Sequence, residues 1–383
     1  MTKNRLFAIF FVVLICFSFF LNQQIKTTLA SNTIEFQTSA QGMVLIESNS
    51  KRVLAGKNKD LTLPMASTTK IMTALSVLKR SENLDTSFEI DKRAVGIEGT
   101  SMYLRKGETL SLKDLLYGML IASGNDAACA LALHFSATIE EFALIMNSDA
   151  RELGLVNTNF KNPHGLDEKG HYTSAYDLAV ITSEAMKYPL FREIVSQKSA
   201  IVKGAGGDQG DSRILINKNR LLGYFPYCTG GKIGFTDNAG RCLVSTASKD
   251  GLDVICVVLN CPDMFLDSKH ILEYGLNNYI YTQLLESYKV HRKVIVEEGK
   301  AEEVKIYTKR SFYYPLTLDE TMSLSFEYDL PEKLTAPIEK EQMIGEYRIS
   351  LNDIVIFKEN LYTLDEVKSV KVIDNLKEIT SNW

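Results

Sequence analysis

The sequence predicts an α+β protein with two domains, and three observations support this fold class. Strand-like and helix-like segments are grouped along the chain rather than strictly alternating, which is typical of an antiparallel sheet with helices packed on it. The chain has 383 residues, 45% of them hydrophobic, so it can bury more than one core. After about residue 290 it becomes strand-like, charged and punctuated by glycine and proline, which indicates a separate small β domain.

The spacing of apolar residues predicts the elements of the first part. Two strands separated by a polar turn are expected at 42–47 and 52–55. Pro64 precedes a helix whose first residues are Ser67 to Lys70. Helical spacing returns in three regions, 111–135, 175–187 and 264–285. The first region is expected to hold two helices, interrupted at Ser123-Gly124-Asn125.

Strands are expected again in the second half of the chain. Asp250-Gly251 is a strong hairpin signal between two apolar runs. The candidate strands are 233–235, 242–247, 254–259, 294–296, 304–307, 324–328 and 347–355.

The N-terminus has the order of a secretory signal. Lys3 and Arg5 precede an apolar run from Leu6 to Leu21, and small residues end the segment at Ala30. We therefore expect a signal peptide over 1–30 and an exported protein. An uncleaved N-terminal anchor is the alternative, although the run is short for a membrane span.

Two domains and a tail are expected after the signal: a large domain over 31–288, a β-rich domain over 289–366 and a tail over 367–383. The tail has apolar residues near helical spacing, from Val367 to Ile379, and ends at Trp383. Two interpretations are open: peripheral contact of a weakly amphipathic helix with a membrane, or a helix packed on the β domain.

Composition excludes some classes of function. The formal net charge is −4 and the sequence pI is about 5.9, which is not the basic field of a nucleic-acid binder. Six cysteines contain no Cys-x-x-Cys motif and no cysteine–histidine cluster at zinc spacing, so no metal and no cofactor is expected. Cys16 lies in the signal, and the other five are expected to be free thiols, mostly buried.

A serine and a lysine suggest nucleophilic catalysis. Serine hydroxyls need a base, and Ser67 and Lys70 are three residues apart, which places both on one face of a helix. At a helix start the N–H of Ser67 is also free to bind an oxyanion. The Ser-x-x-Lys pattern occurs three times, but only this pair lies at an expected helix start; the others are Ser48/Lys51 and Ser76/Lys79.

Two further segments could complete a site. Ser123 and Asn125 lie at a break between helices, where they either project into a cleft or cap a helix. Lys232 lies on an expected strand before Gly234, where it either binds a substrate carboxylate or is solvated. His164 and Asp167 could suggest a Ser-His-Asp triad, but a turn-stabilising histidine is favoured because Lys70 already serves as the base.

These motifs, in this order, resemble the penicillin-recognising serine enzymes. The context resembles the low-molecular-weight D-alanyl-D-alanine carboxypeptidases over roughly residues 35–285, and the β-rich tail resembles that family's second domain more loosely. The resemblance implies an antiparallel sheet with helices on both faces and a helical subdomain. The segments that carry it are 63–74, 120–128, 162–167, 170–172 and 175–179.

The resemblance also implies a mechanism and a substrate, the D-Ala-D-Ala end of a peptidoglycan stem peptide. Ser67 would attack the penultimate carbonyl, Lys70 would take its proton, and Ser123 and Asn125 would relay the proton and orient the substrate. Three residues of the expected strand are implied as well: Lys232 and the Thr236 hydroxyl would hold the terminal carboxylate, and the backbone N–H of Phe235, with that of Ser67, would form the oxyanion hole. β-Lactams would acylate the same serine.

One residue departs from the family pattern. Its third motif is usually Lys-Thr-Gly, whereas Ile233 stands in the middle here and cannot donate a hydrogen bond. Losing one carboxylate contact costs about 1–3 kcal/mol. Ile233 leaves open a weakened or inactive peptidoglycan-binding protein, and a D,D-endopeptidase or a β-lactamase of the same superfamily is kept as a further alternative to a carboxypeptidase. The β-lactamase lacks support because no glutamate near 160–170 is placed to drive deacylation; Glu168 looks like a surface loop residue.

Overall fold

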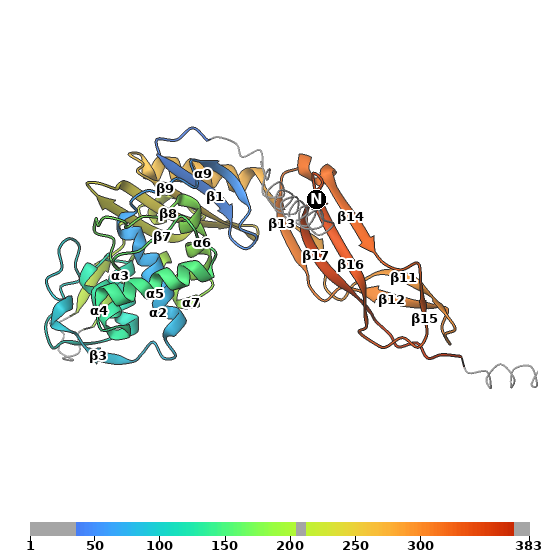
Figure 1. The fold of residues 1–383 in the computed structure, drawn as a ribbon. Coiled ribbons are helices and arrows are strands. Elements are labelled where there is room, and N and C mark those ends of the chain that lie inside the picture. Colours follow the sequence, from blue (N-terminus) through green and yellow to red (C-terminus); the bar gives the residue numbers. More distant parts are fainter. Residues whose placement is uncertain (1–35, 204–211, 371–383) are drawn as a thin grey trace, which may run out of the picture. The chain divides into compact units, whose positions relative to one another are not determined.

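The computed structural model describes residues 36–203 and 212–370 (Figure 1). The expected signal peptide and most of the C-terminal tail lie outside these residues. The described chain divides into two compact units. One runs to Ala247 and adds Ile255–Leu272, and the other consists of Ser248–Val254 and the chain from Glu273 onward.

A five-stranded sheet forms the centre of the first unit. The expected hairpin at Asp250-Gly251 is present, with both residues at positive φ (51° and 82°), as a type I′ turn requires. The two pairings at the sheet's edges, β1 with β2 and β7 with β8, are antiparallel. In spatial order the strands are β2 (Val53–Lys57), β1 (Gly42–Glu47), β9 (Leu252–Leu259), β8 (Gly240–Lys249) and β7 (Cys228–Thr236).

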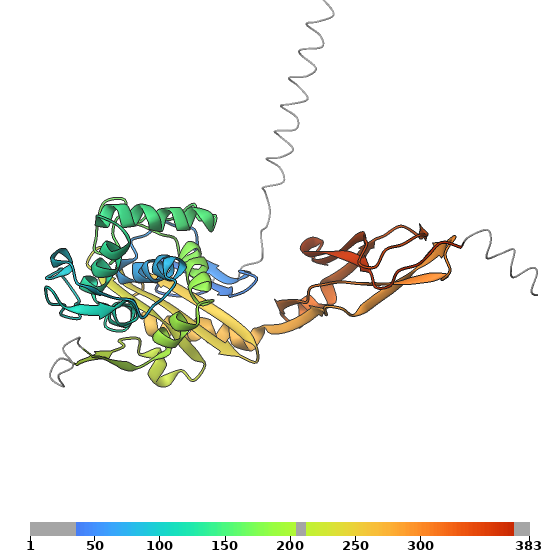
Figure 2. The ribbon, with the colours of Figure 1, turned by 90° about the horizontal axis from the view of Figure 1, so that it is seen from below.

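Helices cover both faces of this sheet. Val44 and Ile46 of β1 belong to the main apolar core, while Met43 and Leu45, which point to the opposite face, are also fully buried. Figures 1 and 2 show α9 on one side of the sheet and the other helices on the opposite side. The longer helices are α2 (Lys70–Arg80), α3 (Leu112–Leu120), α4 (Asn125–Phe135), α5 (Ile139–Glu152), α6 (Ala175–Ala185), α7 (Pro189–Ser196) and α9 (Met264–Asn278).

Short elements complete the first unit. Of these, only η1 falls within an element expected from the sequence, the start of the helix at Ser67 to Lys70. The α3 helix follows one of them and begins with a capping box between Ser111 and Asp114. The short elements are η1 (Ala66–Thr69), β3 (Ser87–Glu89), η2 (Lys92–Ala94), β4 (Thr109–Ser111), β5 (Ser199–Val202), β6 (Arg213–Ile216) and α8 (Leu221–Tyr224).

The second unit is made of strands around its own apolar core. A two-stranded sheet pairs β10 with β13, and a six-stranded sheet has the order β14-β16-β17-β12-β11-β15. Its elements are β10 (Ile280–Leu285), β11 (Val290–Glu297), β12 (Glu303–Tyr307), β13 (Phe312–Leu316), η3 (Asp319–Ser323), β14 (Leu324–Asp329), β15 (Lys333–Thr335), β16 (Met343–Leu351) and β17 (Ile354–Thr363).

Three expectations for this part were wrong. The helix expected over 264–285 ends at Asn278, and β10 follows because it pairs with β13; the second unit therefore begins before the expected boundary at 288. The strand expected over 347–355 is a hairpin, since Asn352 and Asp353 form a turn at positive φ. The first residues of the tail are extended rather than helical, because Val367 forms a bridge to Ile338 and is buried in the β core.

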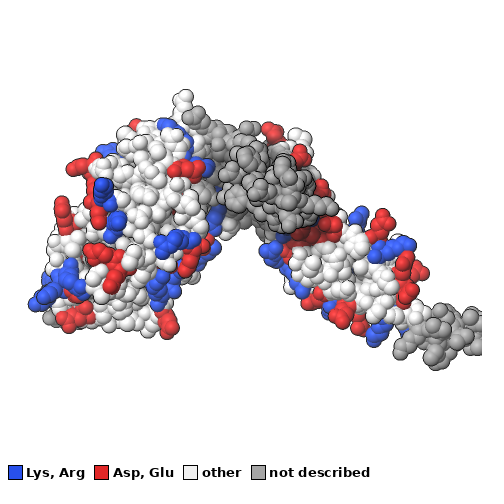
Figure 3. Space-filling model, viewed as in Figure 1, with Lys and Arg blue, Asp and Glu red and all other residues white. Residues whose placement is uncertain are grey.

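Other expectations concern surface and composition. On the face in Figure 3, acidic and basic side chains are interspersed on both units. The five cysteines within the described residues are free, and all but the half-buried Cys228 are buried. No group of described residues has the make-up of a metal site. No single helix in the described ranges is long and apolar enough to cross a membrane; α4 and α5 meet that test only as a pair bent by 83°.

Candidate active site

Ser67 lies in a short 3₁₀ turn rather than in the first turn of an α-helix. This turn, η1, leads directly into α2, which begins at Lys70. Ala66, just before the serine, has a φ of 49°, a left-handed conformation that costs roughly 1 kcal/mol for a residue with a side chain. The half-buried Ser67 is thus presented from a constrained backbone turn.

Lys70 is fully buried and contacts three acceptors. Its Nζ lies 2.9 Å from Ser67 Oγ, 2.6 Å from Asn125 Oδ1 and 2.7 Å from the carbonyl oxygen of His164. Burial, and next the positive charge of Lys232, hold the pKa of Lys70 well below its usual range. A lysine with a depressed pKa beside a serine hydroxyl can act as its base.

Ser123 and Asn125 meet this pair from the break between α3 and α4. Ser123 has a φ of 65°, and its carbonyl accepts a hydrogen bond from Thr100 Oγ1 at 2.6 Å. The amide of Asn125 bridges two groups, since Oδ1 accepts from Lys70 and Nδ2 donates to the carbonyl of Glu98 at 2.6 Å. The helix break therefore directs both side chains into the site.

Lys232 comes from β7 on the opposite side of the site. Its Nζ donates to Ser123 Oγ at 2.8 Å and to its neighbour's carbonyl, that of Ile233, at 3.1 Å. It is buried, and burial, followed by the charge of Lys218, lowers its pKa to about 7. The solvated-lysine alternative therefore does not hold.

Gly234 allows β7 to pass close to the nucleophile. A Cβ atom built at Gly234 would lie 2.9 Å from the backbone nitrogen of Ser67 and 3.0 Å from the Ala66 Cβ. Such distances are too short for a side chain. The backbone of β7 thus runs beside the Ser67 N–H, where an oxyanion hole needs it.

Phe235 and Thr236 lie at the end of β7. The Phe235 side chain is 62% exposed and has no hydrogen-bond donor, so only the backbone N–H of this residue can contribute to an oxyanion hole. The Thr236 hydroxyl donates to Asp167 Oδ1 at 2.8 Å and accepts from the Ala239 N–H at 3.0 Å. The hydroxyl that the sequence assigned to a substrate carboxylate is therefore already hydrogen-bonded within the protein. The sequence did not predict this contact, because Asp167 lies in a loop 69 residues away.

The loop around His164 supports the site through its backbone. His164 Nδ1 accepts from the Leu166 N–H at 3.2 Å, so the imidazole stabilises the turn. Burial, and next the charge of Lys70, lower the pKa of His164 to about 3. The turn interpretation is confirmed, but the contact of the His164 carbonyl with Lys70 was missed, because a backbone carbonyl leaves no signal in a sequence.

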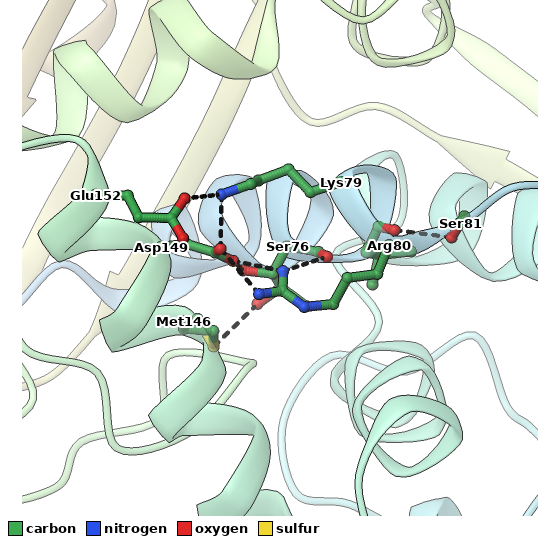
Figure 4. Close-up of polar contacts among 9 residues, drawn as sticks. Ser76, Lys79, Arg80, Ser81, Met146, Asp149 and Glu152 are labelled. Carbon is green, nitrogen blue, oxygen red and sulfur yellow. Dashed lines mark hydrogen bonds and ion pairs between the residues drawn. The ribbon is translucent and has the colours of Figure 1, made fainter.

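The other two Ser-x-x-Lys pairs have structural contacts. In Figure 4, Ser76 and Lys79 both point to Asp149, at 2.6 Å and 2.8 Å, and Arg80 joins them at 2.7 Å. Lys51 pairs with Glu184 at 2.8 Å, and Ser48 accepts from Ser183 through its backbone carbonyl. Of the three pairs, only Ser67 and Lys70 contact each other, and Lys70 also contacts Asn125 and the carbonyl of His164.

The arrangement can carry out acyl transfer. It combines a serine, a buried lysine of depressed pKa, a second serine bound to a second lysine, and a strand beside the serine N–H. An antiparallel sheet with helices on both faces holds these groups. This fold and site define the class of penicillin-recognising serine enzymes.

Comparison with known proteins gives the family. Residues 26–263 match the D-alanyl-D-alanine carboxypeptidase family model, and residues 279–369 match the model of the C-terminal domain of penicillin-binding protein 5. The chain therefore belongs to the D-alanyl-D-alanine carboxypeptidase family.

Individual relatives match over most of their length. D-alanyl-D-alanine carboxypeptidase DacF of Bacillus subtilis is 32% identical over 364 residues, which cover 92% of each chain. DacA of Escherichia coli is 29% identical over 366 residues, covering 91% of this chain and 89% of that protein. The solved structure of penicillin-binding protein 5 from Haemophilus influenzae superposes with a TM-score of 0.74 at 30% identity, over 88% of this chain and all of that one (100%).

Proposed function

We propose that this chain is a serine-type D-Ala-D-Ala carboxypeptidase that removes the terminal D-alanine from peptidoglycan stem pentapeptides through an acyl-enzyme on Ser67. The observation that carries the proposal is the contact between Lys70 Nζ and Ser67 Oγ at 2.9 Å, together with the lowered pKa of Lys70. Membership of the family supports the reaction type.

Acylation begins when neutral Lys70 takes the hydroxyl proton of Ser67. Ser67 Oγ then bonds to the penultimate carbonyl carbon, and the carbonyl electrons move to its oxygen. The backbone N–H groups of Ser67 and Phe235 stabilise this oxyanion. The bond to the terminal D-alanine nitrogen breaks, and the proton that Lys70 took from Ser67 passes to this nitrogen through the hydroxyl of Ser123, which Lys232 holds at 2.8 Å. D-alanine leaves, and Lys70 is neutral again.

Deacylation reverses these roles with water as the nucleophile. Lys70 accepts a proton from the water, the water oxygen bonds to the ester carbon, and the bond from that carbon to Ser67 Oγ breaks. Ser67 regains its proton, and the shortened peptide leaves. Asn125 keeps the Lys70 amine in place by accepting from it at 2.6 Å.

The terminal carboxylate of the substrate is bound at Lys232. Its positive charge is buried, so a carboxylate that reaches it gains a contact little screened by water. We propose the same contact for the carboxylate of a β-lactam, whose ring carbonyl would acylate Ser67. Thr236 can contribute a second contact once its hydroxyl turns from Asp167.

The location of the substrate implies where the enzyme works. Peptidoglycan lies outside the cytoplasmic membrane, so we propose export by the segment 1–30 and action at the extracytoplasmic face of a bacterial membrane. We also propose that the chain beyond residue 370 makes a peripheral membrane contact. Cell fractionation with and without residues 371–383 tests this contact, and an unchanged distribution would remove it.

Two measurements test the enzymatic function. Purified protein should release D-alanine from a peptide ending in Lys-D-Ala-D-Ala, and a fluorescent penicillin should label Ser67, as located by mass spectrometry. Ser67→Ala should lose both activities. Ser76→Ala removes the serine of another Ser-x-x-Lys pair, so it should retain them.

The outcomes also separate the alternatives. Separation of cross-linked peptides into single stem peptides, without release of D-alanine from pentapeptides, would indicate an endopeptidase, and rapid turnover of penicillin would indicate a β-lactamase. Absence of labelling would indicate a peptidoglycan-binding protein without a working nucleophile.

A further inference from the structure

A buried histidine outside the catalytic set contacts the turn that carries the nucleophile. His171 is 6% exposed, and its Nε2 lies 2.9 Å from the hydroxyl of Thr69, which is 0% exposed. Thr69 Oγ1 in turn donates to the carbonyl oxygen of Ala66 at 2.8 Å. A chain of hydrogen bonds therefore runs from His171 to the residue that precedes Ser67.

The direction of this chain is fixed by its far end. His171 Nδ1 accepts a hydrogen bond from the backbone N–H of Lys161 at 3.0 Å. Because Nδ1 must offer a lone pair, a neutral imidazole carries its proton on Nε2. His171 then donates to Thr69, and Thr69 uses its single proton on Ala66. Burial lowers the pKa of His171 to about 4, so the ring is neutral at neutral pH.

The Ala66 carbonyl is held from a second side as well. A Cβ atom built at Gly165 would lie 2.0 Å from this oxygen and 2.9 Å from Thr69 Oγ1, so the backbone of Gly165 packs directly against both. Ala66 has a left-handed φ of 49°. A residue in such a conformation keeps it only where its surroundings enforce it, and the contacts of Thr69 and Gly165 do so here.

We propose that His171 is a positioning residue for the nucleophile: through Thr69 it fixes the Ala66 peptide and thereby aims the Ser67 hydroxyl and N–H at the substrate. His171 itself contacts neither Ser67 nor Lys70 in this arrangement. The proposal rests on the proposed function, because it requires Ser67 to be the acylated residue. A small shift of a reacting group can slow a reaction about 100-fold.

Two pairs of substitutions, one at His171 and one at Thr69, distinguish the effect of losing a hydrogen bond from the effect of changing the shape of the side chain. His171→Asn keeps an acceptor near Nδ1 but removes the donor to Thr69, whereas His171→Gln can place an amide N–H near Nε2. Thr69→Val keeps the shape and removes the hydroxyl, whereas Thr69→Ser keeps the hydroxyl. His134→Asn, on an exposed histidine at the end of α4, is the matched control.

The readout is the second-order rate of acylation by a fluorescent penicillin, measured on folded protein with its melting temperature recorded. We expect His171→Asn and Thr69→Val to slow acylation about 10- to 100-fold, and the double variant to be no slower than the slower single one. His171→Gln and Thr69→Ser should recover most of the rate, and His134→Asn should match the wild type.

Different failures have different meanings. Wild-type rates in both His171→Asn and Thr69→Val would overturn the positioning role and leave the proposed function intact. If His171→Asn does not fold, the comparison of Thr69→Val with Thr69→Ser decides, and equal rates in these two would overturn the role. A wild-type protein that penicillin does not acylate would overturn the proposed function itself.

Discussion

Lys232 lies close enough to Lys70 for its charge to be, after burial, the second cause of the low pKa of Lys70. Each lysine also contacts a different serine, Lys70 that of the nucleophile turn and Lys232 that of the helix break. The two lysines therefore lie in one site, and each is bound to a different serine. In the proposed mechanism, Lys70 is the neutral base and Lys232 is the cation that binds the substrate carboxylate.

This relationship predicts a shift in the pH profile. Lys232→Gln removes a positive charge that disfavours protonated Lys70, so the pKa of Lys70 should rise. Less neutral Lys70 is then present at a given low pH, and the acid limb of the acylation rate should move to higher pH. The measurement is the rate of acylation by penicillin as a function of pH. An acid limb that stays in place would contradict the coupling.

The pKa of Lys232 predicts how KM for D-alanine release changes as the pH rises. Burial, and next the charge of Lys218, place this pKa at about 7, so Lys232 loses its charge as the pH rises through that value. Binding of the substrate carboxylate should weaken there, which would appear as a rising KM for D-alanine release. Lys218→Gln should raise the pKa of Lys232 and move this limb to higher pH. A KM that is flat across neutral pH would argue against the carboxylate role.

Gly234→Ala should block the site without changing any catalytic side chain. The new Cβ would lie 2.9 Å from the Ser67 nitrogen and 3.0 Å from the Met65 carbonyl oxygen, so β7 must move away from the nucleophile turn. Losing one oxyanion donor costs roughly 100- to 1,000-fold in rate. Acylation by penicillin and release of D-alanine should both fall by that order. Near-normal rates would show that the close approach of β7 is unnecessary.

The cluster around Asp149 predicts a separation of stability from activity. Burial alone would raise the pKa of Asp149, but hydrogen bonds from Arg80, Lys79 and Ser76 lower it below its ordinary value of 3.8. A depressed carboxyl pKa stabilises the fold above the unfolded-state pKa, and this contribution is lost as the pH falls through the folded-state value. Asp149→Asn should cost about 1–3 kcal/mol of unfolding free energy at pH 7.

The same variant provides its own control. Below about pH 4 the difference in unfolding free energy between Asp149→Asn and the wild type should shrink, because the wild-type carboxyl becomes protonated. Its acylation by penicillin at neutral pH should remain normal, since Asp149 contacts none of the catalytic groups described above. Urea unfolding at several pH values checks the first expectation, and a deficit that does not depend on pH would contradict it.

The side chains of the proposed mechanism could be predicted from the sequence where neighbours along the chain bring them together. Ser67 and Lys70 are one turn apart, and Ser123 and Asn125 lie at a visible helix break. The supporting contacts could not be found. The carbonyls of Glu98 and His164 have no sequence signature, and Asp167 reaches Thr236 across 69 positions of the chain.

Errors in the fold arose where one segment suited two structures. The segment 280–285 alternates weakly and also continues a helical spacing, so only its pairing with β13 decides that it is a strand. The turn at Asn352-Asp353 lies between two runs of similar composition. In both places, contacts distant in sequence override the local pattern.

Replacing Ile233 by threonine should raise the rate of D-alanine release rather than lower it. It lies between Lys232 and Gly234 on β7, where the family pattern has a threonine, and the nearby Thr236 hydroxyl is engaged with Asp167. A substrate carboxylate at Lys232 therefore lacks a hydroxyl donor from the residues 233–236 unless Thr236 first turns from Asp167. Ile233→Thr should supply one, and a hydrogen bond of about 1–1.5 kcal/mol corresponds to roughly a 5- to 10-fold rise in kcat/KM for release of D-alanine.

The control is Ile233→Val, which has the shape of threonine and no hydroxyl. Steady-state release of D-alanine from a peptide ending in Lys-D-Ala-D-Ala compares the two variants. Because both shorten the side chain equally, only the hydroxyl can make them differ, and the gain should appear in Ile233→Thr alone. Equal kcat/KM values in the two variants would mean that this position does not face the substrate carboxylate. The activity of the natural enzyme would then not be limited by its isoleucine.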